Sequence, residues 1–101
     1  MDSLKEKVEY VIGSVDLFGL DAPYVCYLDD ECEAEIAWHI GDAVVTAAVS
    51  NGINSVSVLE KTRRRSFEWD YVEFDQMSEF LHTLKDKLRK FEKERREVGC
   101  Q

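Results

Sequence analysis

The residues that could carry out nucleophilic or metal chemistry are few in this sequence. The chain has two histidines and three cysteines among its 101 residues. His39 with Cys26 or Cys32 would form a thiol–imidazole pair. The same histidine with Glu35 would form part of a metal site. Both combinations lack the spacing and the third partner that such sites require, and His82 lies in a separate segment. We therefore expect no catalytic residue, no bound metal, no cofactor and no enzymatic activity.

The cysteines favour a reducing compartment. Cys26, Cys32 and Cys100 are odd in number and lack C-x-x-C spacing. No secretory signal is recognisable near the start of the sequence. No apolar run approaches the roughly 20 residues that span a bilayer. We expect a cytoplasmic protein with free thiols and no membrane contact.

Acidic residues dominate the first half of the chain, and the formal net charge is −8. This charge disfavours binding to nucleic acid or to anionic membranes and favours a basic protein partner. Two interpretations of the densest acidic cluster remain open. The cluster is either a partner-binding edge that resembles a row of phosphates, or a charged guard that keeps an edge strand from aggregating. Its members are Asp29, Asp30, Glu31, Glu33 and Glu35.

Basic residues gather at one later point, where Lys61 is followed by Arg63, Arg64 and Arg65. Such a group on a hairpin tip could bind phosphates, and neighbouring aromatic residues would then stack on bases. The net charge opposes binding to polyanions, and the aromatic residues are needed for a core. The sequence therefore favours a solvated loop that pairs with acids of the protein itself or of a partner.

The elements that must position these residues begin with two hairpins between residues 33 and 59. Gly41-Asp42 and Asn51-Gly52 separate β-rich runs, which is the strongest short-range signal for tight hairpins. With these turns, Trp38 lies opposite Val45, and Val45 lies opposite Val58. One face of the sheet then collects the large apolar side chains. They are Ile36, Trp38, Ile40, Val45, Val49, Val56 and Val58.

A fifth strand follows the basic residues, because Phe67, Trp69 and Tyr71 alternate with acids over a short run. A turn over residues 61–64 would pair Val58 with Phe67 and Val56 with Trp69. Trp69 would then join Trp38 in the core. Residues 24–28 form a first strand whose register stays open, because both of its faces are apolar.

Helices are predicted at both ends of the chain. Apolar residues repeat at helical spacing from Leu4 to Val15, with the helix ending near residues 17–18, and again from Gln76 to Val98. We predict one α+β domain over residues 1–101, a five-stranded antiparallel meander with both helices on one face. The second helix is long enough to project past the sheet. Leu88, Phe91 and Val98 on this projection are candidates for a homodimer contact.

Two helices can cover only one face of such a sheet, so the other face is expected to be open. It would carry Glu35, Ala37, His39, Val44, Thr46, Ala48, Ser55, Ser57, Leu59, Glu68 and Asp70. This face is either an ordinary solvated surface or a docking surface with an acidic rim around an apolar centre at Val44, Ala48 and Leu59. The sequence leaves both interpretations open.

The leading hypothesis for function is non-catalytic binding of a partner protein. A small acidic α+β domain with an open sheet is similar in size and charge to many phage-encoded inhibitors of bacterial defence systems, such as anti-CRISPR proteins. The resemblance implies an inhibitor that occludes a basic or nucleic-acid-binding surface of its target. The alternative is a small nucleic-acid-associated regulatory protein that uses the basic loop at residues 61–65.

Overall fold

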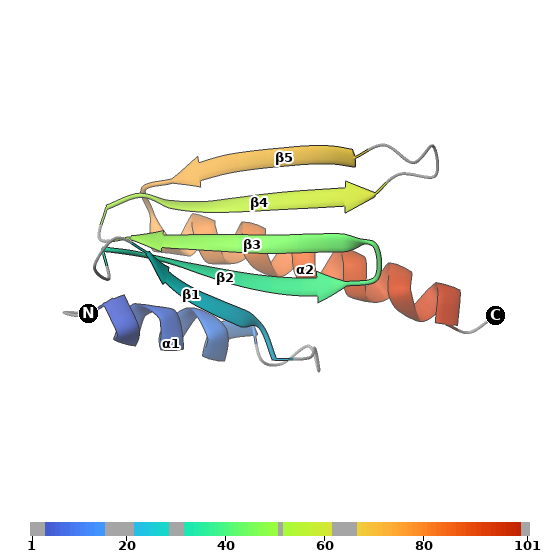
Figure 1. Cartoon of the computed structure of the whole chain (residues 1–101), viewed down its shortest axis with the longest axis horizontal. Helices are drawn as coiled ribbons and strands as arrows, with labels where there is room; N and C mark the ends of the chain where they lie inside the picture. Colours follow the sequence, from blue (N-terminus) through green and yellow to red (C-terminus); the bar gives the residue numbers. More distant parts are fainter. Residues whose placement is uncertain (1–3, 16–21, 29–31, 51, 62–66, 100–101) are drawn as a thin grey trace.

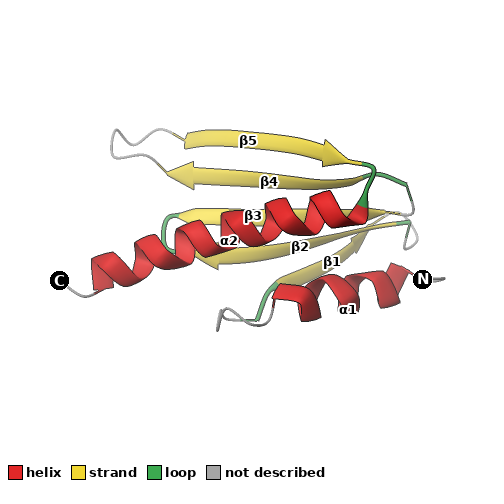
Figure 2. Cartoon of the chain, turned by 180° about the vertical axis from the view of Figure 1, so that it is seen from behind, coloured by secondary structure: helices red, strands yellow, loops and turns green. Residues whose placement is uncertain are grey.

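The computed structural model describes residues 4–15, 22–28, 32–50, 52–61 and 67–99, except for the side chains of Phe67 and residues 94–99. Its five strands form one antiparallel sheet in the order β1-β2-β3-β4-β5. Both helices lie on the same face of this sheet (Figure 2), and the opposite face carries no helix (Figure 1). This confirms the predicted α+β meander. The elements in chain order are α1 (Leu4–Val15), β1 (Tyr24–Leu28), β2 (Glu33–Ile40), β3 (Ala43–Ser50), β4 (Asn54–Lys61), β5 (Phe67–Phe74) and α2 (Met77–Gly99).

The central hairpins have the predicted registers. Trp38 pairs with Val45, and Val45 pairs with Val58. Gly41, in the β2–β3 turn, has a φ of 61°, a left-handed conformation that glycine adopts without steric cost. The register of β1, which the sequence left open, places Val25 opposite Ile36.

The core lies between the helices and the helix-facing side of the sheet. Buried and partly exposed side chains alternate along β2 and β3, because successive side chains of a strand point to opposite faces. The helices contribute one apolar stripe each. The buried apolar residues are Leu4, Val8, Val11, Val15, Ala34, Ile36, Trp38, Ile40, Ala43, Val45, Ala47, Val49, Val56, Val58, Phe80, Leu81, Leu84, Leu88 and Phe91.

The predicted pairing of β4 with β5 is wrong. Phe67 pairs with Lys61 instead of Val58, a displacement of three positions, because the ladder continues to the last residue of β4. An odd displacement turns each side chain to the other face. Trp69 is therefore 68% exposed on the open face, whereas Trp38 is 3% exposed in the core.

The observed register is supported by contacts on the helix-facing side of β5. Asp70 lies 3.5 Å from the ammonium group of Lys87 on α2. Further along, the ring of Phe74 lies 6.4 Å from the ring of Phe80 on α2. Glu68 and Asp70, which we expected on the open face, therefore belong to the side that α2 covers.

Leu88 and Phe91, which we named as candidate homodimer contacts, are 0% and 5% exposed. Both are part of the core between α2 and the sheet, so neither is available to a second chain. The side chain of Val98 lies outside the described part of α2. α2 extends beyond the end of the sheet, as its length predicts (Figures 1 and 2).

α1 is tied to the sheet by Lys7, whose ammonium group donates a hydrogen bond to the backbone oxygen of Ser50 at the end of β3. Partial burial lowers the pKa of Lys7 below its ordinary value, because desolvation disfavours the charged form. In the described part of the chain, neither helix has the length and apolarity needed to cross a membrane. Cys26 and Cys32 are exposed free thiols.

We expect opposite effects from adding a methyl group at two glycines. Gly41→Ala should lower the free energy of unfolding by about 1–2 kcal/mol, because the left-handed conformation is strained for other residues. Gly13→Ala should raise it by about 0.5–1 kcal/mol, since a methyl group at this helical position meets no atom within 4 Å. Urea unfolding of both variants measures the two values. Equal effects at the two positions would contradict the assigned turn conformation.

Candidate docking surface

The acidic cluster is only partly described. Glu33 and Glu35 lie on β2, where Glu35 is exposed on the open face and pairs with Cys26 of β1. Asp29, Asp30 and Glu31 lie outside the described residues. Arg63, Arg64 and Arg65 of the basic loop also lie outside them. Of these two predicted groups, the described members are Glu33 and Glu35 on β2 and Lys61 at the end of β4.

The open face has an apolar centre on β3 and β4, as the sequence predicts. Val44 pairs with Leu59 across these strands. Leu59 pairs in turn with Trp69 of β5, so the three side chains form one row across the sheet. Leu59 is 40% exposed although it lies on an inner strand. The row shows that the apolar centre continues to the edge of the sheet.

Tyr71 enlarges this row, since it lies on the same face of β5 as Trp69. The two rings are stacked, with centroids 5.6 Å apart and planes inclined by 29°. Tyr71 is 46% exposed and Trp69 is 68% exposed, so a large part of the pair is in contact with water. We call Val44, Leu59, Trp69 and Tyr71 the aromatic patch.

Small side chains separate the aromatic patch from the opposite edge of the sheet. Thr46 lies between Ala37 on β2 and Ser57 on β4, and Ser57 pairs with Tyr71. At the other end of this row, Tyr24 of β1 pairs with Ala37 and is 78% exposed. The open face is thus a low central floor with aromatic residues on both edge strands.

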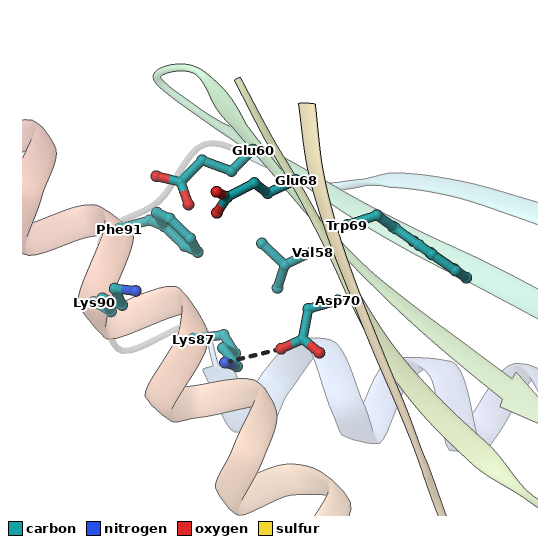
Figure 3. Close-up of a pocket in the computed structure, with 8 residues that line it drawn as sticks. All are labelled: Val58, Glu60, Glu68, Trp69, Asp70, Lys87, Lys90 and Phe91. Carbon is teal, nitrogen blue, oxygen red and sulfur yellow. Dashed lines mark ion pairs between the residues drawn. The ribbon is translucent and has the colours of Figure 1, made fainter. Parts of the chain in front are cut away.

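A cleft of about 300 Å³ lies on the other side of β5, between this strand and α2. Figure 3 shows acidic groups of the sheet opposite lysines of α2, whereas the indole of Trp69 points to the open face. The ammonium group of Lys90 lies 5.3 Å from the ring centre of Phe91. The cleft is lined by Val58, Glu60, Glu68, Trp69, Asp70, Lys87, Lys90 and Phe91.

Two carboxylates of this cleft are directly opposed. Glu60 of β4 pairs with Glu68 of β5, and both side chains point toward α2 (Figure 3). Like charges opposite one another destabilise a pair of strands. Among the described residues, the ion pair in the cleft joins Lys87 to Asp70 and leaves these two carboxylates without a salt bridge.

The residues considered for catalysis are dispersed. His39 is exposed on β2, and Cys26 is exposed on the neighbouring strand β1 but pairs with Glu35. His82 lies on α2, 3.3 Å from Asp86 one turn further on. Within the described residues, histidines, cysteines and acids do not gather into a group of three that could hold a metal ion.

Trp69 and Tyr71 are the functional candidates that sequence analysis missed. The alternation of these aromatic residues with acids predicts that the aromatic side chains face the core, and this prediction is wrong. No local signal in the sequence distinguishes the two registers, because the contact of Asp70 with Lys87 on α2 is remote in sequence. Comparison of the chain with protein-family models, curated proteins and solved structures finds no match.

Proposed function

We propose that this protein is a non-catalytic binding module that docks onto a partner protein through the aromatic patch. The observation that carries the proposal is the stacked pair of Trp69 and Tyr71, which lies on the open face rather than in the core. Two large aromatic side chains in this position leave apolar surface in contact with water. A partner that covers them would recover the free energy of burying that surface.

The composition of the open face supports the same proposal. Tryptophan and tyrosine are enriched among the residues that dominate the energy of protein interfaces. The small residues of the central floor, such as Thr46 and Ser57, leave room for a partner to approach the aromatic patch closely. An apolar patch with a polar rim is the usual organisation of such an interface.

Charge favours a basic partner. Glu35 and Glu73 lie at one end of the open face, and the whole chain carries a net charge of −8. Such a field accelerates encounter with a positively charged surface. More specifically, we propose that the protein is an inhibitor that occludes a basic or nucleic-acid-binding surface of its target.

Binding of single-stranded nucleic acid is the second candidate, because exposed aromatic rings on a sheet can stack on bases. The net charge opposes this candidate, since nucleic-acid affinity depends on neutralising phosphates. Titration of a fluorescent single-stranded oligonucleotide at low salt tests it. Binding that weakens steeply as salt rises would favour this second candidate over a protein partner.

Chemical crosslinking in an extract of the source organism tests the main proposal. We expect a crosslinked partner protein whose affinity for the purified chain falls at least about thirtyfold in the double variant Trp69→Ala/Tyr71→Ala. Tyr10→Ala, at an exposed tyrosine on α1, is the matched control and should leave the affinity unchanged. Equal binding by all three proteins would exclude the aromatic patch as the docking surface.

A further inference from the structure

We propose that the outer edge of β5 binds an extended basic segment of the partner as a sixth strand of the sheet. The proposal rests on the proposed function, because it names the chemistry of the partner and the way in which it is held. Addition of a strand to an exposed sheet edge is a recurrent mode of peptide recognition. Four features of β5 support it.

The first feature is the length and regularity of this edge. β5 is the last strand of the sheet, has eight residues, and pairs with β4 without interruption. Its residues from Glu68 to Glu73 are all exposed. The other edge, β1, has five residues and follows Pro23, which cannot donate a backbone hydrogen bond. β5 is therefore the better template for an added strand.

The second feature is the direction of the backbone groups. The amide of Lys61 donates to the carbonyl of Asp42, 3.1 Å away, so the backbone groups of Lys61 face β3. Backbone groups of successive residues in an antiparallel ladder alternate in direction. Glu60 therefore faces β5, and its partner Glu68 faces β4. The same alternation directs the amides and carbonyls of Trp69, Tyr71 and Glu73 outward.

The third feature is the charge on the helix-facing side of this edge. The opposed carboxylates of Glu60 and Glu68 lie in the cleft beside Asp70. A lysine or arginine on an added strand would lie next to Glu68 and would reduce the repulsion of the pair. The cleft volume of about 300 Å³ is at the lower end for ligand pockets and suits one side chain better than a larger molecule.

The fourth feature is the aromatic patch on the opposite side of the same strand. Alternate residues of an added strand would lie beside Trp69 and Tyr71, and apolar side chains there would cover both rings. The recognised segment therefore alternates basic residues with apolar residues. A second copy of this chain is a poor occupant, because it would bring Glu68, Asp70 and Glu73 of two strands together.

A synthetic peptide tests the inference directly. The probe is an eight-residue peptide with blocked ends in which lysine alternates with valine. We expect a Kd below about 1 mM by calorimetry. Binding should also shift the emission of Trp69 to shorter wavelength as its indole leaves water. A peptide with glutamate in place of lysine, and a lysine–valine peptide whose alternate amides are methylated, should not bind.

Two matched pairs of variants separate charge from backbone pairing. Glu68→Lys should weaken peptide binding by about fivefold or more. Glu9→Lys changes the net charge equally at an exposed position of α1 and should not. Glu73→Pro removes an outward amide and should bind at least about fivefold more weakly than Glu73→Ala. Proline is tolerated at such edge positions, and circular dichroism checks the fold.

The outcomes distinguish this inference from the proposed function. Absence of peptide binding up to about 1 mM would overturn it, and so would equal binding of the methylated peptide. If the natural partner depends on Trp69 and Tyr71 but not on Glu68 or the amide of Glu73, the docking surface stands and the added strand is excluded. If instead the natural partner binds equally well to the chain and to the variant Trp69→Ala/Tyr71→Ala, the proposed function is overturned.

Discussion

Replacement of Trp38 by alanine is expected to lower the free energy of unfolding by about 3–5 kcal/mol, the cost of deleting a large buried aromatic side chain. Trp38 is 3% exposed and belongs to the core, opposite Val45 on β3. The loss combines the transfer of the indole from the interior with the cavity that remains. Urea unfolding followed by circular dichroism measures it. A domain of ordinary stability would lose a large part of its margin.

Trp69→Ala is the matched control for this prediction. Its indole is on the open face and stacks on Tyr71, so the free energy of unfolding should fall by no more than about 1.5 kcal/mol. Each variant leaves one tryptophan. The emission of Trp38 should lie at short wavelength in Trp69→Ala, and that of Trp69 at long wavelength in Trp38→Ala. Similar spectra, or equal losses of stability, would contradict the observed pairing of β4 with β5.

Leu88→Ala is expected to cost about 2–5 kcal/mol of unfolding free energy, because Leu88 has no exposed surface beneath the sheet. The loss should not depend on protein concentration, since the contacts of Leu88 lie within one chain. Thermal unfolding over a hundredfold range of concentration measures both the loss and its independence. A melting temperature that rises with concentration in the original protein, and no longer rises in the variant, would instead assign Leu88 to a dimer contact.

Lys93→Ala serves as the control on the same helix. Its side chain is exposed on α2, so substitution should change the free energy of unfolding by no more than about 0.5 kcal/mol. Alanine is also a good helix former, so helix propensity adds no penalty. A large loss at Lys93 would mean that α2 contributes to stability by contacts other than its apolar stripe.

Much of the fold follows from local chemistry in the sequence. The β2–β3 turn demands a left-handed residue, and Gly41 supplies it. A register error there would move Trp38 out of the core, so pattern and turn reinforce one another. The apolar stripe from Leu4 to Val15 likewise marks a helix with one buried face, and α1 spans Leu4–Val15. The predicted end of this helix, near residues 17–18, lies outside the described residues.

The pairing of β5 could not be predicted in the same way. No glycine-containing turn lies between Lys61 and Phe67, so turn chemistry does not fix the register. Either face of β5 could then be the one that faces the helices, since one face carries aromatic residues and the other carries acids and a valine. Asp70 forms an ion pair with Lys87 on α2, and this contact joins residues that are remote in sequence. Tertiary contacts, including that of Phe74 with Phe80 on α2, therefore decide which set lies on the helix-facing side.

Two of the four residues of the aromatic patch could be predicted from the sequence, because only the central hairpin register was correct. Val44 and Leu59 were placed on the open face because the central hairpin register was correct. Trp69 and Tyr71 were assigned to the core by the error of three positions. The exposed aromatic pair became visible only once the ladder between β4 and β5 was known.

The alternation of side chains along β3 and β4 allows this protein to change what it recognises without changing how it folds. Val45 and Val58 on one side are confined by close packing, where most substitutions cost stability. Their neighbours Val44, which is partly exposed, and Leu59, which is 40% exposed, lie on the face opposite the helices. Positions of this kind tolerate replacement at less cost than the core. Diversification of the open face in a library would therefore yield new binding specificities on one unchanged scaffold, with the residues of the opposite face held fixed.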